Sequence, residues 1–489
     1  MTRIAESPAG SEKTFFGHPR GLATLFFTEM WERFSYYGLR ALLILFMTAG
    51  PEAGGLGFDV ATAGAVYGLY TSMVYMMSVP GGWIADRVLG LRRAVLYGGV
   101  IIALGHYSLA AGSLASFYLG LALVVLGTGL LKPNISVIVG QLYAPADQRR
   151  DAGFSIFYMG INLGAFIAPL ACGWVGQRID WHLGFGLAGI GMTLGLIQYL
   201  AGRRHLRGIG EPPTAPDAQT RRKLIWGISV TGGAALLVAL LAFQGLVTPK
   251  ALAGAAGIML LAVVIGLFGW MFLAGSWSAA ERRRLAVIAL LFAASTIFWS
   301  VFEQAGSTLN LFAARNTRTA ILGFDFPASW LQSVNGLLII LLAPVFAWLW
   351  LALGRRDPSS PAKFSLGLLF AGLGFAVLAL GATGAGGARI SPLWLVVTYV
   401  CHTIGELCLS PVGLSAMTKL APERVAGLMM GAWFLSLAAG NYLGGRVSTF
   451  YEALSLPALF TAVAAYAMVA AVAMALLIRP ARRLMSGAG

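Results

Sequence analysis

Long apolar segments recur along almost the whole chain, from Gly21 to Ile478. Most have about 20 residues or more, enough for a helix to cross a hydrocarbon core roughly 30 Å thick. The connections between them are mostly short and rich in glycine, proline or charge, which end helices. The pattern predicts about fourteen membrane-spanning helices, at residues 21–48, 60–85, 93–112, 115–140, 152–176, 183–202, 223–244, 250–275, 284–308, 327–353, 363–382, 391–416, 425–447 and 455–478.

The longest internal break separates the first six predicted spans from the rest. It runs from Ala201 to Lys223 and contains GEPPTAPDAQT. Two spans without interior charge follow, and then six more. Transporters built as two bundles bind substrate near the membrane midplane, between halves that rock. We therefore expect an all-α polytopic membrane protein with two six-helix bundles and two inserted helices. Its expected parts are an N-terminal tail (1–20), a first bundle (21–202), a linker with the inserted pair (203–283), a second bundle (284–478) and a C-terminal tail (479–489).

Composition and charge agree with a membrane protein and predict its orientation. Hydrophobic residues make up 58% of the chain and charged residues 11%, against about a quarter charged in soluble proteins. About 25 of the lysines and arginines lie in the tails and in one set of alternate loops, which predicts that both termini are cytoplasmic. The net charge of +15 is thereby explained by topology and lipid headgroups, without nucleic-acid binding. The three cysteines lie in apolar segments and form no CxxC motif, so we expect packing residues rather than metal ligands.

The first span contains an unusual polar stretch, EMWERFSYYGLR, within an otherwise apolar helix. Charged side chains at membrane depth are expensive and mark function by default. The spacing of three and four residues places them on one helical face. This face must contact a water-filled cavity or partner side chains, because lipid does not tolerate it. Its members are Glu29, Glu32, Arg33, Tyr36, Tyr37 and Arg40.

Three further charges lie inside later spans. Counting residues from the span ends places Lys132 and Glu406 at about the depth of Glu29 and Glu32. Arg40 and Glu303 lie nearer the outer side and can balance each other. The deeper group then holds three carboxylates, those of Glu29, Glu32 and Glu406, and two cations, Arg33 and Lys132. Burial and like-charge neighbours both favour a neutral carboxyl group, which predicts that one of these acids carries a proton near neutral pH. A group of static buried pairs is the alternative, but such pairs are poor stabilisers.

Several uncharged groups are candidates for the same cavity. Asn162 and Asn335 are amides inside apolar spans, and each could bind a ligand or satisfy its own helix. Trp433, Tyr70 and Tyr36 could form its walls, although a single membrane Trp or Tyr is more often a core or interface residue. We interpret His402, four residues before Glu406, as a core residue.

Motifs along the chain resemble those of one transporter family. EMWERFSYYG resembles the ExxERFxYYG signature of the proton-coupled oligopeptide transporters, a bacterial and animal branch of the major facilitator superfamily. The segments GTGLLKPNISVIVGQLY, FSIFYMGINLGAFIAPL, FWSVFEQAGSTLNLFA and GELCLSPVGLS resemble the family's fourth, fifth, seventh and tenth helices. The likeness covers residues 15 to about 445, and the first signature is highly specific. It implies the major facilitator fold, with the inserted helix pair of bacterial members.

The resemblance also implies a function: import of di- and tripeptides, driven by protons. It assigns proton coupling to Glu29, Glu32, Arg33, Lys132 and Glu406, with Lys132 pairing with Glu406. It assigns an outer-side salt bridge to Arg40 and Glu303. Peptide contacts would come from Arg33, Tyr36, Tyr70, Lys132, Asn162, Asn335, Glu406 and Trp433. Animal members rely on a histidine in the second helix; none stands in residues 60–85, so carboxylates would carry the proton here.

The expected protein is thus a transporter of a bacterial inner membrane, functional as a monomer, with peptides, protons and membrane lipids as partners. It would need no cofactor beyond the proton gradient. A proton-coupled carrier of another small solute, either a drug antiporter or a nitrate-type relative, is the alternative. A channel would need a repeated pore ring or filter, and an enzyme would need a nucleophile elbow, phosphate loop or metal cluster; the sequence shows none of these.

Overall fold

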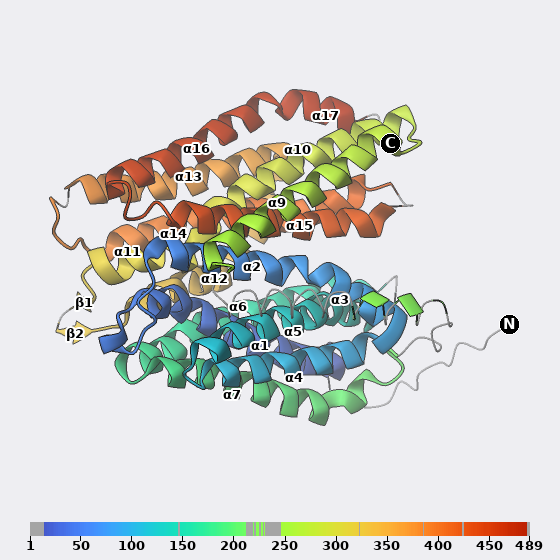
Figure 1. The fold of residues 1–489 in the computed structure, drawn as a ribbon. Coiled ribbons are helices and arrows are strands. Elements are labelled where there is room, and N and C mark those ends of the chain that lie inside the picture. The colour runs from blue at the N-terminus through green and yellow to red at the C-terminus, as the bar shows by residue number, and fades with distance from the viewer. Residues whose placement is uncertain are drawn as a thin grey trace.

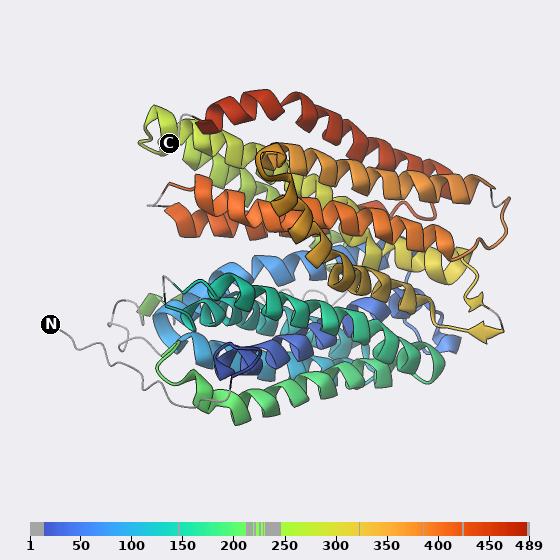
Figure 2. The ribbon, with the colours of Figure 1, turned by 180° about the vertical axis from the view of Figure 1, so that it is seen from behind.

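A computed structural model describes residues 14–144, 147–211, 246–321, 323–384, 386–422 and 425–486, with a few single residues between 219 and 229. Helices form two layers, each a bundle, that lie side by side in Figures 1 and 2. Nine helices in the described part are long and apolar enough to cross a membrane by length and composition. Helix α1 is not among them, because the charged stripe lies within it. The predicted span 223–244 falls largely outside the described residues.

The first bundle contains the N-terminal helices. They are α1 (Arg20–Thr48), α2 (Val60–Met76), α3 (Ser78–Ile84), α4 (Leu91–Leu109), α5 (Leu114–Gln141), α6 (Arg150–Arg178) and α7 (Trp181–Gly202). Short helical turns lie beside them at η1 (Pro51–Ala53), η2 (Ala85–Leu89) and η3 (Arg203–Leu206). Several helices begin at a side chain that accepts a hydrogen bond from the first turn, a common N-cap: Asp59 caps α2, Ser113 caps α5 and Asp180 caps α7.

The second bundle contains α10 (Ala279–Phe302), α11 (Thr308–Asn316), α12 (Ser333–Leu353), α13 (Ser360–Gly384), α14 (Leu393–Leu420), α15 (Ala426–Ser448), α16 (Leu456–Leu476) and α17 (Ile478–Ser486). Helical turns precede or join them at η5 (Glu303–Gly306), η6 (Ala328–Gln332) and η7 (Gly354–Arg356). A small antiparallel hairpin, β1 (Ala320–Ile321) and β2 (Phe324–Asp325), follows α11. We call the end of the molecule with this hairpin the hairpin end. The opposite end, where α1 begins and α17 ends, is the terminal end (Figure 1).

One inserted helix is described, α9 (Pro249–Gly269), which continues into the wide turn η4 (Trp270–Ala274). It begins with the Thr248 cap and Pro249, a favourable first helical residue. It packs against α2 of the first bundle and α15 of the second. Lys250 forms an ion pair with Asp59 at 3.1 Å. The inserted helix therefore contacts both bundles along their common edge.

The polar contacts that join the bundles lie toward the hairpin end. The Asn310 amide donates to the Ala41 carbonyl at 2.9 Å, and the Trp330 indole donates to the Leu170 carbonyl at 3.0 Å. Arg178 of α6 pairs with Asp325 of β2 at 2.7 Å. Here α2 and α15 approach closely, since a Cβ at Gly68 would lie 2.9 Å from the Cα of Gly445. The two bundles are thus held together at the hairpin end.

Every predicted span within the described residues falls on a helix or on consecutive helices. One boundary was wrong. The expected span 284–308 begins earlier, because Ser278 and Glu281 form a capping box that draws the three arginines 282–284 into the first turns of α10. The same segment is also broken at Glu303 and continues as α11 to Asn316. The sequence pattern shows continuous hydrophobicity across this break and therefore did not reveal it.

Candidate functional site

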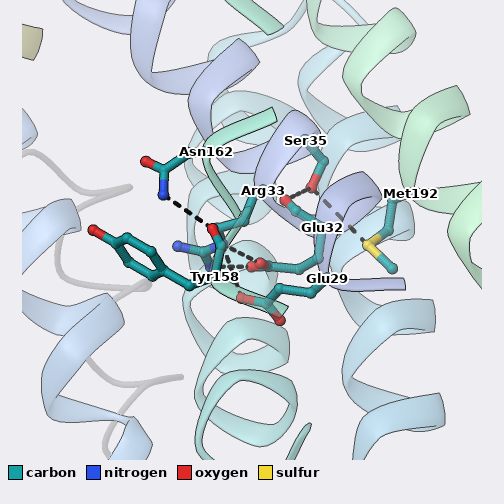
Figure 3. Close-up of polar contacts among 7 residues, drawn as sticks. All are labelled: Glu29, Glu32, Arg33, Ser35, Tyr158, Asn162 and Met192. Carbon is teal, nitrogen blue, oxygen red and sulfur yellow. Dashed lines mark hydrogen bonds and ion pairs between the residues drawn. The ribbon is translucent and has the colours of Figure 1, made fainter. Parts of the chain in front are cut away.

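Three members of the charged stripe of α1, Glu29, Glu32 and Arg33, are buried and lie close together (Figure 3). The Arg33 guanidinium donates through two nitrogens to both carboxylate oxygens of Glu32. Its Nε also lies 3.5 Å from Oε1 of Glu29. The side chains of all three are 3% exposed or less. One cation is therefore shared by two carboxylates out of contact with bulk water.

The two carboxylates are held differently. Both oxygens of Glu32 face Arg33, whereas Oε2 of Glu29 is buried and has no hydrogen-bond partner among the described residues. A buried carboxylate oxygen without a partner is costly while the group is charged. A proton on Glu29 would remove that charge. The structure therefore distinguishes Glu29 as the acid of the pair that is less firmly bound.

Glycines of α6 bring this helix against the stripe. A Cβ at Gly160 would meet Phe26 at 2.9 Å, and a Cβ at Gly164 would clash with the Met30 carbonyl. Gly160 and Gly164 form the GINLG motif, so its role here is close packing of α6 on α1. The same helix carries Asn162, whose amide donates to the Tyr158 carbonyl at 3.0 Å (Figure 3).

Lys132 of α5 lies over the ring of Tyr75, with Nζ 4.1 Å from the ring centroid. This is a cation–π contact, which stabilises a desolvated ammonium group. No ion pair between Lys132 and Glu406 is present among the described residues. The pairing implied by the family resemblance is therefore not formed in this conformation.

Glu406 of α14 instead belongs to a small polar group in the second bundle. Its Oε2 accepts from the Asn335 amide at 3.2 Å, and the same amide donates to the Thr403 hydroxyl at 3.0 Å. Asn335 comes from α12, so it joins two helices of this bundle. The structure thereby brings together two residues that the sequence analysis assigned to one cavity.

Arg40 and Glu303 form a buried ion pair between the bundles. Arg40 Nη2 lies 2.9 Å from Glu303 Oε2, and Arg40 Nε donates to the Tyr67 hydroxyl at 3.1 Å. Neither atom of the ion pair has a well-aligned hydrogen bond, so the attraction is mainly between charges. Glu303 stands where α10 breaks. At Gly306, a Cβ would clash with the Tyr67 hydroxyl and lie 2.7 Å from Arg40 Nε, so only glycine leaves room for this group.

A cavity lies beside this ion pair and between the bundles. Its lining includes Tyr37 and Arg40 from α1, Asn335 and Gln332 from the α12 region, and Tyr399 and His402 from α14. The His402 side chain is buried at 1% exposure. Tyr37 is within electrostatic range of Arg33, Arg40, Glu303 and Glu406. The cavity region is therefore where the charges of both bundles converge.

The remaining predicted residues are buried with fewer polar contacts. In the described part of the chain, the hydroxyls of Tyr36 and Tyr70 have no hydrogen-bond partner, and the Arg33 guanidinium lies 4.8 Å from the centroid of the Tyr36 ring. Trp433 is 4% exposed and packs on α14 at Gly413.

Sequence reasoning missed Tyr67, Tyr75 and Tyr399. The closely spaced tyrosines of YGLYTSMVY on α2 were a signal that could have indicated the first two. No group of three or more His, Cys, Asp or Glu side chains suited to a metal occurs within the described ranges.

The comparison with known families decides the identity of the chain. The family model described as the POT family matches residues 92–465. The chain belongs to the POT family. The match does not depend on the α1 signature, which lies before residue 92, so the signature and the family match support each other independently.

Relatives within the POT family are similar over nearly their full length. The chain is 43% identical to the peptide transporter YePEPT of Yersinia enterocolitica, over 99% of this chain and 98% of that protein. It is 42% identical to a di-/tripeptide transporter of Lactococcus lactis subsp. cremoris, over 91% of this chain and 92% of that protein. A crystal structure of a peptide transporter POT in complex with sulfate is 45% identical with a TM-score of 0.91, covering 96% of this chain and 97% of the other. The chain therefore has the major facilitator fold of the family.

Proposed function

We propose that this POT family member is a proton-driven symporter that imports di- and tripeptides by alternating access. The observation that carries the proposal is the arrangement of opposite charges on two bundles, with Arg33 buried and Lys132 and Glu406 half-buried. Arg33 and Lys132 belong to the first bundle and Glu406 to the second. Relatives of the same length carry the names peptide transporter and di-/tripeptide transporter.

A short peptide matches this arrangement chemically. It is a zwitterion, so its carboxylate needs a cation and its ammonium group needs an acid. Arg33 or Lys132 supplies the first, and Glu406 on the facing bundle supplies the second. The amides of Asn162 and Asn335 can bind the peptide bond. Because these contacts use only groups that all peptides share, side chains of different sizes are tolerated.

Proton coupling follows from the shared guanidinium. When a peptide carboxylate binds Arg33, it competes with Glu29 and Glu32. The displaced acid is then buried without its cation, which favours proton uptake. Lys132, which has a cation–π contact rather than an ion pair here, is free to pair with Glu406 or with peptide in another conformation. Peptide and proton are thereby bound together.

The orientation and organisation belong to the same proposal. The terminal end faces the cytoplasm, both termini included, in a bacterial inner membrane. Contacts between bundles toward the hairpin end support a conformation that is closed to the outside. The division into a first bundle (21–202), a linker with the inserted pair (203–283) and a second bundle (284–478) stays a prediction. We propose that one monomer forms the whole transport path, without a cofactor other than the proton gradient.

The proposal is tested by uptake of labelled dialanine into vesicles that contain the purified chain. We expect accumulation with an inward proton gradient and only equilibration without it. Dialanine blocked by N-acetylation or C-amidation should compete poorly, because each blocked terminus loses one charged contact. Equal competition by blocked and free dialanine would refute recognition through the termini. Proton-driven movement of a drug or nitrate without peptide uptake would favour the alternative carriers.

A further inference from the structure

A dense group of arginines lies at the terminal end of the second bundle. It comes from the first turns of α10 and from the short last helix α17, which pack against each other (Figure 1). These two segments contain six arginines: Arg282, Arg283, Arg284, Arg479, Arg482 and Arg483. Glu281 is the one acid in 278–286 and 478–486, and it is occupied in capping α10, where it accepts from the Ser278 amide at 2.8 Å. The local charge is strongly positive.

Packing of α17 fixes where its arginines point. Ala481 is 2% exposed, and Leu484 and Met485 pack partly buried against the hydrophobic core. Arg479 and Arg482, three residues apart, are exposed on the other side of the helix. The apolar face of α17 is thus covered by the protein, and its basic face is left at the surface.

Four arginines of the basic surface lack an acidic partner among the described residues. Arg282 and Arg283 are exposed at the start of α10, next to α17. In the parts of the chain that the structure describes, none of Arg282, Arg283, Arg479 and Arg482 forms an ion pair with an acid. We call these four residues the arginine corner. Its guanidinium groups are exposed and available to an anionic ligand.

Exposed apolar side chains next to the arginine corner place it near the boundary between lipid headgroups and acyl chains. The turn η4, which directly precedes α10, exposes Trp270 and Leu273, the latter to 89%. The Trp270 ring packs edge-on against the buried Trp277, at 6.0 Å between centroids. Tryptophan is enriched at the boundary between headgroups and acyl chains. The basic surface of the corner is therefore complementary to a lipid phosphate, and the apolar side chains beside it are complementary to acyl chains.

We propose that the arginine corner binds the headgroup of an anionic phospholipid in the leaflet at the terminal end. Guanidinium groups suit this role because their fixed fork of donors matches phosphate oxygens. Basic pockets at helix ends on the cytoplasmic side bind anionic headgroups in this way. The acyl chains would lie along Trp270 and Leu273. The site is remote in the fold from the charged cavity, so it concerns the lipid surroundings rather than the peptide.

The test is binding of short-chain phosphatidylglycerol to the full-length chain in neutral detergent, measured by native mass spectrometry. Phosphatidylcholine with the same acyl chains is the reference lipid. We expect retention of phosphatidylglycerol to exceed that of phosphatidylcholine by about tenfold or more, given the strength of basic clusters near anionic headgroups. The variant Arg479→Gln with Arg482→Gln should lose most of this preference, and Arg479→Lys with Arg482→Lys should keep only part of it, because lysine retains the charge but not the fork of donors.

A matched control removes the same charge elsewhere. Arg203 and Arg204 are exposed in η3 at the terminal end of the first bundle, and changing both to glutamine should leave the lipid preference unchanged. Equal loss in the control and corner variants would overturn the proposal, as would no loss in either. If inorganic phosphate displaces phosphatidylglycerol at similar concentration, the corner is a simple anion site and the lipid assignment fails.

The unaltered chain gives a second test that needs no variant. Raising salt from about 0.1 M to about 1 M shortens the Debye length from roughly 10 Å to roughly 3 Å. The preference for phosphatidylglycerol should fall severalfold over this range while phosphatidylcholine retention stays constant. A preference that is independent of salt would contradict a site made of arginines. Neither measurement requires transport, so the result does not depend on the proposed peptide uptake.

Discussion

At the scale of single residues, the shared guanidinium of Arg33 is the feature with the clearest consequence. Glu32 is bound through both oxygens, whereas Glu29 has one buried oxygen without a partner among the described residues. Glu29 can therefore become neutral with less loss of binding than Glu32.

We predict that Glu29→Gln reduces proton-driven uptake by about tenfold or more but preserves peptide counterflow, which needs no net proton movement. Glu32→Gln should reduce driven uptake as well and should also preserve counterflow, because it removes a competitor of the peptide carboxylate for Arg33. Arg33→Ala should impair both uptake and counterflow. The measurement is driven uptake and counterflow in the same reconstituted preparations. If both glutamine variants concentrate peptide at the original rate, the stripe is structural.

The ion pair of Arg40 and Glu303 is testable by a double-mutant cycle. The two groups are 2.9 Å apart and their side chains are 5% exposed, so removal of one leaves the other as an uncompensated buried charge. We predict that Glu303→Gln and Arg40→Gln are coupled by about 1–3 kcal/mol, measured from transport rates of the single and double variants. Additive effects of the two substitutions would show that the pair has no functional role.

At the scale of elements, the start of α2 is held by one acid. Asp59 accepts hydrogen bonds from the hydroxyl of Thr62 at 2.6 Å and from its amide at 2.8 Å, and it pairs with Lys250 of α9. The hydrogen bond from the Thr62 side chain is the main reason that the pKa of Asp59 is lowered from 3.8 to about 2. A carboxylate with a lowered pKa stabilises the fold above its ordinary pKa and loses that effect as pH falls through the lowered value.

We therefore predict that Asp59→Ala lowers the stability of the purified chain by about 1 kcal/mol, as a decrease in thermal unfolding temperature. The decrease should be constant from pH 7 down to about pH 4 and shrink only as the pH approaches 2. Asp59→Asn, which keeps a capping oxygen but not the charge, should have a smaller effect. A decrease that changes between pH 7 and pH 5 would point to a different titrating group.

At the scale of the whole molecule, close approach of α2 and α15 holds the hairpin end closed. A Cβ at Gly445 would clash with the Cα of Gly68. Because alternating access requires this contact to open and close, a larger side chain there changes the population of conformations rather than local packing alone.

We predict that Gly445→Leu opens the hairpin end. The measurement is the distance between spin labels at Leu114 and Phe450, which are exposed at this end of the two bundles, after replacement of the three native cysteines. The distance distribution should shift to longer values. The matched control is Gly266→Leu on α9, where a Cβ would meet nothing within 4 Å. An unchanged distribution in Gly445→Leu would show that this contact does not control closure.

The sequence by itself determined the membrane class and the helical spans, and it marked the charged residues within those spans. These follow from the chain alone, because a bilayer requires each span to be about 20 apolar residues long. A charge within such a span is energetically costly and therefore rare, so it is easily recognised in the sequence. The stripe from Glu29 to Arg40 and the isolated charges Lys132, Glu303 and Glu406 were visible for that reason. The α1 signature that resembles the family is a continuous stretch of ten residues, so it could also be found without a structure.

Only the tertiary structure decided which of these charges meet. The adjacent residues Glu32 and Arg33 form the tight pair, while Lys132 contacts Tyr75 instead of Glu406. Such partners are chosen by how α1, α5, α6 and α14 pack, which depends on glycines such as Gly164 and Gly306 that carry no chemistry of their own. The break of α10 at Glu303 and the docking of α17 beside α10 are likewise invisible in a continuous hydrophobic pattern. They arise because contacts between distant segments, rather than local periodicity, determine where a helix bends and which of its faces is covered.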